Sequence, residues 1–421
     1  MSPARPANQP RFGRVTVSTL GDLDGVAVSH WTDAEARTGV TVVILPEGST
    51  ASAEIRGGAP ATREFDVLAP SATVTRLDAV VLSGGSAFGL ASVDGVVSTL
   101  AEAGRGFVTA GGVVPIVAGM SLFDLTVGSA QVRPGAAEGA AAAAAALSAV
   151  SPPGAEPQAV PESMANAIEG GKHAVGQPAV GQRGVELVFG AVGAGTGATV
   201  SKWRGRDHAA AGGLVTATVV EGGFSVSALV AVNAFGDVVG HGPADQLWPS
   251  LVPPDEVGAF GADGTPAPNA AGGGRDSVGG DPGGGGRESV GGDPGGGGRD
   301  SVGAGADGSA VSSAGTNTTL GVIVTDADLT KTECLLLAQG AHDGYARAIT
   351  PPHCRVDGDA VVAAATGAVP LADPSDPRRV AEVELLRWMA VRATADALAT
   401  LADVAPTGPI PWMTPPAEPG S

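Results

Sequence analysis

The sequence is poor in aromatic residues and in cysteine. Phe, Trp and Tyr together make up 4% of its 421 residues, and Tyr345 is the only tyrosine. The two cysteines, Cys334 and Cys354, are too few for a disulfide framework and do not have the spacing of a metal site. Because glycine is abundant, with 66 residues, we expect backbones that approach closely and pack through small side chains.

Positive charge is also scarce. Lys and Arg number 24 against 43 Asp and Glu, so the formal net charge is -19. This balance argues against nucleic-acid binding, because affinity for a phosphate backbone depends on clustered Lys and Arg. No apolar run reaches the ~18 residues of a membrane span, and residues 1–14 lack the apolar core of a signal peptide. We therefore expect a cytoplasmic protein without membrane or nucleic-acid partners.

The elements expected are both strands and helices. A hydrophobic content of 43% is enough for a substantial core. β-Branched and apolar runs predict strands at residues 26–31, 39–45, 77–82, 186–192, 198–203, 213–220, 224–233, 318–324 and 359–366, with 186–192 paired to 198–203 and 213–220 to 224–233. Helices are predicted at residues 136–150, 330–349 and 377–401. The pattern fits an α+β protein, in which helices cover sheets.

Two helix features are predicted in more detail. Thr330-Lys-Thr-Glu333 has the pattern of a capping box at the start of its helix. The helix at residues 377–401 is predicted to have one apolar face, formed by Val380, Val383, Leu386, Met389, Ala390, Ala393, Ala397 and Leu401.

Ser86 lies in the glycine-rich corner Gly84-Gly85-Ser86-Ala87-Phe88, after a predicted strand and before an amphipathic stretch. This corner is one glycine short of a nucleophile elbow, which needs glycine two residues after the serine. We therefore interpret Ser86 as the N-cap of a helix that ends near Gly104.

Residues 253–311 differ in character from the rest of the chain. Arg275-Asp-Ser-Val, Arg287-Glu-Ser-Val and Arg299-Asp-Ser-Val recur at a period of 12 residues among glycines. Such a composition cannot bury a core. We expect a flexible, solvated insertion.

The stretch from Gly315 to Asp326 follows this insertion and contains a candidate nucleophile. Thr318 stands at the start of an apolar run, where its hydroxyl is suitably placed to attack the carbonyl of Asn317. If that peptide bond breaks, Thr318 becomes an N-terminus, and its α-amino group, with a reference pKa of about 7.7 to 8.0, can act as the base. On residue types alone, the same residues also fit a turn that leads into a strand.

Six blocks of the sequence resemble, in order, the self-cleaving aminopeptidases of the DmpA type. This family includes L-aminopeptidase/D-esterase, β-aminopeptidase and, in the branch nearest to this chain, the nylon-oligomer hydrolases. The blocks are residues 57–64, 82–90 and 193–198 for the large subunit, and residues 318–326, 329–349 and 357–359 for the small subunit. The resemblance covers about residues 13–250 and 312–405.

The resemblance implies a set of site residues. Thr318 matches the nucleophile, and Asn233 matches the asparagine whose amide donates to the oxyanion. Lys202, at the end of the predicted strand 198–203, matches a lysine of the nylon-hydrolase branch. Asp357 and Asp359 match an acidic pair of that branch, in place of Ser and Glu in the aminopeptidases. In an extended segment these two alternate residues share one face. A lysine beside a hydroxyl or an amine lowers the pKa of that hydroxyl or amine.

The implied fold is a four-layer αββα sandwich, with the N-terminal nucleophile on a central strand and the chain self-cleaved into two subunits. One departure concerns a large-subunit tyrosine that family aminopeptidases use near the oxyanion, because Tyr345 lies on the predicted small-subunit helix. This departure bears on aminopeptidase specificity more than on self-cleavage.

We predict cleavage between Asn317 and Thr318 and, after it, hydrolysis of short peptides or amides without a metal or cofactor. The family implies a heterodimer of the two fragments and a homo-oligomer of such heterodimers. The predicted organisation is a disordered N-terminus at residues 1–14, the large-subunit core at 15–252, the insertion at 253–311, the end of the large subunit at 312–317, the small subunit at 318–405 and a disordered tail at 406–421.

Other functions remain open on the sequence alone. Ornithine acetyltransferase has a related fold and also self-cleaves ahead of a threonine, but it transfers the acyl group to an amine instead of water. An uncleaved binding or scaffold protein would use the repeat segment as its working part. A metal hydrolase is the weakest alternative, because the six histidines are scattered without ligand spacing.

Overall fold

The computed structural model describes residues 14–18, 20, 23–150, 189–240 and 317–413. The chain divides into two compact units, and the unit at residues 247–313 lies outside the described residues. The predicted insertion with its repeats therefore has no described structure. All helices and strands named below belong to the other unit.

The first sheet has six strands in the order β1-β2-β3-β6-β9-β5. These are β1 (Arg14–Ser18), β2 (Ala27–Asp33), β3 (Thr38–Ile44), β6 (Ala79–Ser83), β9 (Val117–Ser121) and β5 (Thr62–Arg63). Neighbouring strands are antiparallel except β6 and β9, which are parallel. Every residue of β3 and β6 is buried, as expected for apolar strands that are covered on both faces. The strands predicted at residues 26–31, 39–45 and 77–82 are confirmed as β2, β3 and β6.

The second sheet has five strands in the order β12-β13-β15-β17-β4. These are β12 (Gly213–Glu221), β13 (Phe224–Asn233), β15 (Thr318–Ala327), β17 (Ala360–Val369) and β4 (Thr50–Ile55). The central strand β15 is antiparallel to β13 and parallel to β17. The predicted hairpin is confirmed as β12 and β13, and the strands predicted at residues 318–324 and 359–366 are confirmed as β15 and β17.

Shorter strands also pair among the described residues: β7 (Phe107–Thr109) with β8 (Gly112–Val114), β10 (Thr199–Val200) with β11 (Ala210–Ala211), and β14 (Asp237–Val238) with β16 (Ile349–Thr350).

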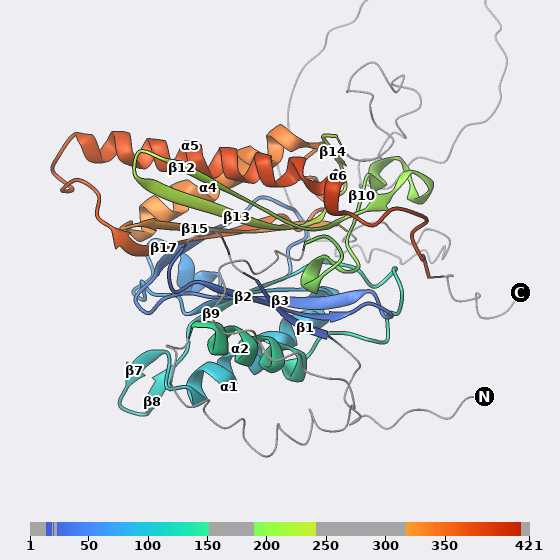
Figure 1. Ribbon diagram of the computed structural model, residues 1–421, viewed down its shortest axis with the longest axis horizontal. Coiled ribbons are helices and arrows are strands. Elements are labelled where there is room, and N and C mark those ends of the chain that lie inside the picture. The colour runs from blue at the N-terminus through green and yellow to red at the C-terminus, as the bar shows by residue number, and fades with distance from the viewer. Residues whose placement is uncertain (1–13, 19, 21–22, 151–188, 241–316, 414–421) are drawn as a thin grey trace, which may run out of the picture. The chain divides into compact units, whose positions relative to one another are not determined.

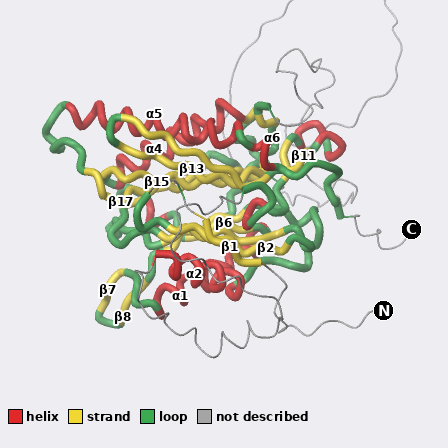
Figure 2. Tube along the Cα trace, viewed as in Figure 1, coloured by secondary structure: helices red, strands yellow, loops and turns green. Residues whose placement is uncertain are grey.

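Helices cover the outer face of each sheet (Figure 1). The first sheet is covered by α1 (Ser92–Glu102) and α2 (Ala136–Val150), and the second by α4 (Lys331–Ala348) and α5 (Arg378–Ala399), which α6 (Leu401–Val404) follows. Figure 2 shows the two groups of strands lying between these helices. The three predicted helices and the capping box of Thr330 and Glu333 are confirmed. The expectation of a mixed protein of helices and sheets is confirmed as well.

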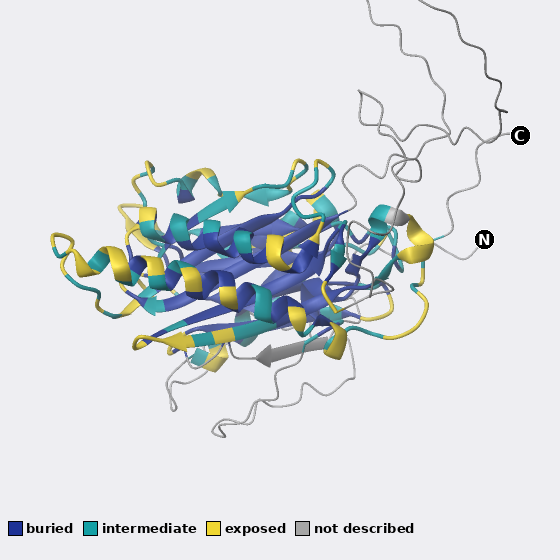
Figure 3. Ribbon diagram, turned by 90° about the horizontal axis from the view of Figure 1, so that it is seen from above, coloured by how far each residue is buried: buried dark blue, intermediate teal, exposed yellow. Residues whose placement is uncertain are grey.

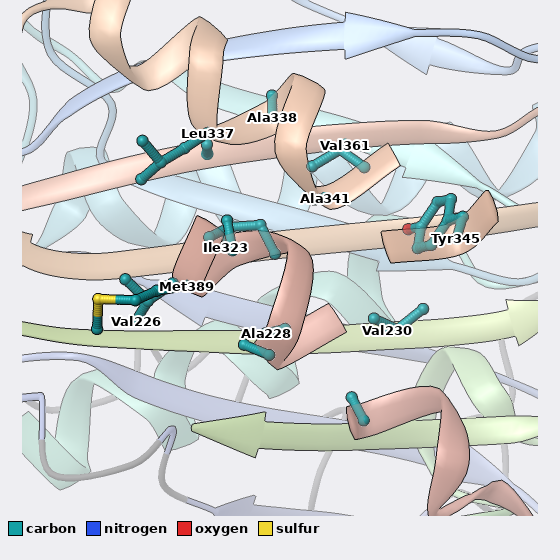
Figure 4. Close-up of a cluster of buried hydrophobic side chains, with 14 of the residues drawn as sticks. Val226, Ala228, Val230, Ile323, Leu337, Ala338, Ala341, Tyr345, Val361 and Met389 are labelled. Atoms are coloured by element: carbon teal, nitrogen blue, oxygen red, sulfur yellow. The ribbon is translucent and has the colours of Figure 1, made fainter. Parts of the chain in front are cut away.

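Apolar clusters fill the spaces between these layers. One cluster joins the second sheet to α4 and α5 and includes Val226, Ala228, Val230, Ile323, Leu337 and Met389 (Figure 4). A second cluster lies between the sheets, and a third joins the first sheet to α1 and α2. Figure 3 shows the strands as the buried part of the fold and the outer turns of the helices as exposed. Each fully buried Leu or Ile side chain contributes about 1.5 to 3 kcal/mol to folding.

The two faces of the second sheet can be followed along its strands, because successive side chains of a strand point to opposite sides. On β13, Ala228 packs toward the helices, whereas Leu229 packs toward the first sheet. On β15, Leu320 and Val322 face the first sheet and Ile323 faces the helices. A side chain two residues before Leu320 therefore points into the space between the sheets.

Gly95 of α1 and Gly139 of α2 allow these helices to touch through their backbones. A Cβ atom on Gly95 would overlap the carbonyl oxygen of Ala136, and one on Gly139 would overlap that of Ser92. No larger residue fits at either position without moving a helix. The expectation that backbones approach closely is confirmed at this contact.

Ser86 does not cap a helix. The 3-10 helix Ser86–Ala91 precedes α1, and Ser86 itself has a φ of 54°. The backbone N–H groups of Gly85 and Ser86 donate to the Asp124 carboxylate at 2.7 Å and to the Leu122 carbonyl at 2.9 Å. Contacts distant in sequence fix this corner, so the N-cap prediction is wrong.

Two further predictions need correction. Val380 lies in the first turn of α5 and is 69% exposed, whereas the other residues of the predicted apolar face are buried. In the predicted disordered tail, Gly128 N–H donates to Pro411 O at 3.1 Å, and Met413 N–H donates to Thr126 O at 2.9 Å. This part of the tail is ordered by a distant segment, and residues 414–421 lie outside the described residues.

Candidate active site

Thr318 is the first residue of the central strand β15 and is buried, with 3% of its surface exposed. It lies opposite Asn233, the last residue of β13, in the antiparallel register of these strands. The alternation along β15 points its side chain into the space between the sheets. Its hydroxyl donates a hydrogen bond to the carbonyl oxygen of Asn317, so the candidate nucleophile lies beside the bond that it is predicted to cut.

The Asn233 amide is held in one orientation. Its Oδ1 accepts hydrogen bonds from Lys202 Nζ at 2.8 Å, Thr199 N at 2.9 Å and Thr199 Oγ1 at 3.3 Å. Its Nδ2 donates to the Phe123 carbonyl at 3.0 Å. Because donors surround Oδ1 and an acceptor meets Nδ2, the oxygen and nitrogen of the amide cannot exchange places. Asn233 therefore joins the ends of both sheets at the site.

Lys202 reaches Asn233 from a different element than we predicted. It begins the 3-10 helix Lys202–Arg204, after Ser201 with a φ of 62°. The strand before it is β10, which pairs with β11. Of its predicted partner, residues 189–192 form no strand and residues 186–188 lie outside the described residues. The Trp203 N–H donates to the carbonyl of Phe235 at 3.1 Å, so contacts with the segment after β13 wind these residues into a turn. The strand predicted at residues 198–203 is therefore wrong beyond Val200, although Lys202 still contacts Asn233, the strand partner of Thr318.

Asp357 lies in the loop between β16 and β17. Its carboxylate accepts hydrogen bonds from the backbone N–H groups of Phe235 and Cys354, each at 3.2 Å. Its backbone pairs with Asn317 in a parallel bridge. Asp357 thus ties this loop to the segment after β13 and to the residue before Thr318.

Asp359 lies on the other side of Gly358. One carboxylate oxygen accepts a hydrogen bond from Thr319 N–H at 2.7 Å. The other accepts from His353 N–H at 3.1 Å and lies 2.9 Å from His353 Nδ1. The two acidic residues therefore hold the chain on either side of Thr318, Asp357 at Asn317 and Asp359 at Thr319.

Burial moves the protonation equilibria of this site toward neutral forms. It lowers the pKa of the Lys202 ammonium to about 7, against the attraction of Asp357. Burial and the charge of Asp359 raise the pKa of the Asp357 carboxyl to about 8, against the attraction of Lys202. Groups that exchange protons near neutral pH are what acid–base catalysis needs.

Sequence reasoning missed His353 and the backbone amide of Gly358. His353 packs edge-on against His342, with ring centroids 4.9 Å apart, and supports Asp359 from behind. The Gly358 N–H donates to the Asn317 carbonyl oxygen at 3.0 Å. A histidine four residues before an acidic pair gives no recognisable spacing, and a backbone donor leaves no mark in a sequence.

Tyr345 does not take the place of the family tyrosine at the oxyanion. It is fully buried in the cluster between α4 and the second sheet (Figure 4), and its hydroxyl rests against Gly321. Gly321 is three residues along β15 from Thr318, so the two point to opposite faces of the sheet. The hydroxyl has no hydrogen-bond partner among the described residues, and it lies on the wrong face to reach Thr318.

Two features are absent from the part of the chain that the structure describes. No group of three or more His, Cys, Asp or Glu side chains among these residues could hold a metal ion. None of the helices described is long and apolar enough to cross a membrane.

Comparisons with known proteins agree with the resemblance seen in the sequence. The model of peptidase family S58 matches residues 18–405. An uncharacterised aminopeptidase of Mycobacterium leprae is 35% identical over 362 residues, which are 84% of this chain and 80% of that protein. An uncharacterised aminopeptidase of Mycobacterium tuberculosis is 35% identical over 363 residues, 84% of this chain and 83% of that protein.

A solved structure shows the same fold. The L-aminopeptidase D-Ala-esterase/amidase of Ochrobactrum anthropi, described as a variant of the Ntn hydrolase fold, superposes with a TM-score of 0.50 and 16% sequence identity, covering 96% of this chain and 89% of its own. The expected relationship to aminopeptidases of this type is confirmed by the family match. Since that match spans most of the sequence, the chain belongs to peptidase family S58 and is a hydrolase of peptide or amide bonds.

Proposed function

We propose that the chain is a self-processing amide hydrolase whose nucleophile, Thr318, is released by cleavage of the Asn317–Thr318 peptide bond. The observation that carries this proposal is the hydrogen bond from the Thr318 hydroxyl to the Asn317 carbonyl, made where a buried strand begins. A hydroxyl held against the preceding carbonyl is the arrangement from which an acyl shift from nitrogen to oxygen can start.

The cleavage takes place in two steps. Thr318 Oγ adds to the carbonyl carbon of Asn317, and the C–N bond breaks as the Thr318 nitrogen takes up the hydroxyl proton and becomes an amine. Water then hydrolyses the ester, which leaves a carboxylate on Asn317 and restores the Thr318 hydroxyl. The products are residues 1–317 and 318–421.

In turnover, the freed Thr318 attacks the carbonyl of a substrate amide and its own α-amine relays the proton to the leaving group. Asn233 donates its amide N–H to the developing oxyanion, since Lys202 and Thr199 hold its oxygen away from that role. Lys202 and Asp357, whose pKa values burial moves to about 7 and about 8, assist proton transfer. Asp359 keeps Thr319, and with it the new N-terminus, in register.

The substrates we propose are short peptides or amides from which an N-terminal residue is released. Relatives that are 35% identical over most of their length are named aminopeptidases, which supports this class. The family match favours neither transfer of the acyl group to an amine nor a scaffold without activity.

The layered arrangement supports the αββα sandwich of N-terminal nucleophile hydrolases as the fold class. The sheet order also supports a heterodimer of the two fragments. Strands β15 and β17 of the small fragment lie between β13 and β4 of the large fragment, so the cut chains would still share one sheet. A homo-oligomer of such heterodimers is proposed on family likeness alone.

Intact mass under denaturing conditions tests the proposal. Two species that divide between Asn317 and Thr318 are expected, followed by release of p-nitroaniline from aminoacyl p-nitroanilides. A single full-length species after prolonged incubation would contradict self-processing. Two species without activity on any aminoacyl anilide or ester would leave self-processing intact and contradict the proposed substrate class.

A further inference from the structure

We infer that the backbone N–H of Gly358 is the oxyanion donor of the self-cleavage step, an inference that rests on the cleavage proposed between Asn317 and Thr318. Gly358 N lies 3.0 Å from the Asn317 carbonyl oxygen, the oxygen that also accepts the Thr318 hydroxyl. It therefore touches the reacting group directly.

The chemistry of the step places charge on that oxygen. As Thr318 Oγ bonds to the carbonyl carbon, the C=O double bond becomes a single bond and its electron pair moves onto oxygen. The hydroxyl hydrogen bond to the same oxygen is lost at that moment, because the proton leaves Oγ for the nitrogen. The Gly358 N–H stays in place and its hydrogen bond strengthens as the charge grows, which is how a fixed donor lowers a barrier.

The donor is fixed by its neighbours. Asp357 N–H donates to Cys354 O at 2.9 Å, and Asp357 O accepts from Ala59 N–H at 2.8 Å. On the other side, Asp359 accepts from Thr319 N–H at 2.7 Å. The peptide group between Asp357 and Gly358 is thus held against the scissile bond from both sides, without any reorganisation needed during the reaction.

This arrangement gives the acidic pair a further role. Asp357 and Asp359 also position the intervening amide, since Asp357 ties one end of it to Cys354 and Ala59 and Asp359 ties the other end to Thr319. Asn233, the donor implied by the family for substrate turnover, uses one of its amide N–H groups on Phe123 O at 3.0 Å. The two reactions would then rely on different donors, Gly358 for self-cleavage and Asn233 for hydrolysis of substrate.

The site also requires that residue 358 has no side chain. A Cβ atom on Gly358 would lie 2.7 Å from Thr318 Oγ1 and 2.8 Å from the Ala59 carbonyl oxygen. Alanine would keep the N–H but push the nucleophile aside. Loss of the donor and loss of space can therefore be separated by changing one without the other.

The decisive variant replaces Gly358 by glycolic acid during cell-free translation, which exchanges the N–H for an ester oxygen and adds no side chain. The appearance of the two fragments is followed by denaturing mass spectrometry. Loss of one oxyanion donor typically slows a reaction about 10²- to 10³-fold, and we expect a decrease of this size in the cleavage rate. The same replacement at Gly57, whose N–H donates to the Asp359 carbonyl at 3.1 Å, is the control for weakening the same loop and should change the rate by no more than a few fold.

The outcomes are distinct. If the unmodified chain from the same translation stays whole, the proposed function fails and this inference with it. If the unmodified chain splits and the Gly358 ester splits equally fast, only the inference is overturned. Equal slowing by the Gly57 and Gly358 esters would also overturn it, because loop anchoring would then explain the effect. Thermal melts of both ester chains identify any loss of folding before rates are compared.

Discussion

Lys202 Nζ lies 2.8 Å from Asn233 Oδ1 and 3.2 Å from the Asn233 carbonyl oxygen. One ammonium thus binds two oxygens of a single residue at the end of β13. Since an amide presents either its oxygen or its NH₂ group to a neighbour, this contact decides that Asn233 offers a donor to the site. The side chain of Lys202 spans from the 3-10 helix to the end of the strand.

Replacing Lys202 with Met should therefore reduce both cleavage and hydrolysis, because Met keeps the apolar stem but removes the ammonium. We expect rates about 10²- to 10⁴-fold lower, the range typical of a lost proton-transfer group. Fragment formation and anilide hydrolysis measure the two steps. Arg392→Met, on the exposed side of α5, is the control and should leave both unchanged. Equal rates in Lys202→Met and the parent chain would contradict a role for the ammonium.

Thr318→Ala should yield an intact, inactive chain, because no hydroxyl remains to attack Asn317. Thr318→Ser keeps the hydroxyl and should still split, although the loss of a buried methyl group lets the side chain rotate more freely. Denaturing mass spectrometry distinguishes the two. A Thr318→Ala chain that still divides at this bond would show that another residue is the nucleophile.

The pH dependence of stability should reveal the shifted carboxyl of Asp357. Its pKa is raised from the ordinary 3.8 to about 8, so between these values the folded chain holds a proton that the unfolded chain has released. The free energy of unfolding should therefore fall as the pH rises through this window. For Lys202, whose pKa is lowered from 10.5 to about 7, the unfolded chain holds the extra proton, and the free energy of unfolding should rise from pH 7 to 10.5.

Urea denaturation of the Thr318→Ala chain, with and without Asp357→Asn, isolates the carboxyl. From pH 5 to pH 7 we expect the Thr318→Ala chain to lose stability relative to the double variant, because asparagine has no proton to release. The partly exposed Asp396→Asn serves as the control. Curves for the single and double variants that run parallel over this range would contradict the raised pKa.

Leu337→Ala should destabilise the fold by about 2 to 5 kcal/mol, the usual range for a cavity left by a fully buried leucine. Val380→Ala, at a position that is 69% exposed, should change the free energy of unfolding by no more than about 0.5 kcal/mol. Urea denaturation of the Thr318→Ala chain avoids the complication of two fragments. A similar loss in both variants would mean that the first turn of α5 is covered.

The elements that sequence analysis predicted well are those with strong local signals. The Thr330–Glu333 capping box, the hairpin of β12 and β13, and the β-branched run after Thr318 each depend on residues close together in the chain. Periodicity also predicted most of the buried face of α5. It failed at Val380, because a periodic pattern does not show how fully neighbouring elements cover each position.

The site was predictable only as a set of side chains. Resemblance indicated Thr318, Asn233, Lys202 and the two aspartates, and the structure brings them to one place. The resemblance did not indicate the hydrogen bonds that connect them. The turn that carries Lys202 depends on Trp203 N–H reaching Phe235 O, which no local pattern indicates. The contact of His353 with Asp359 likewise forms only in the folded chain. The same holds for the hydrogen bond from the Gly358 amide to Asn317, which joins segments distant in sequence.

The strand order of the second sheet has a consequence for what would follow the proposed cleavage. The two small-fragment strands lie between β13 and β4, so their backbone hydrogen bonds run to the large fragment on both edges. Dilution should not separate the two fragments, because separation would break two ladders of backbone hydrogen bonds and open two apolar clusters at once. The two fragments should therefore elute together from a size-exclusion column and separate only in denaturant. A fragment produced alone would expose two unpaired edge strands, and unpaired edge strands promote aggregation.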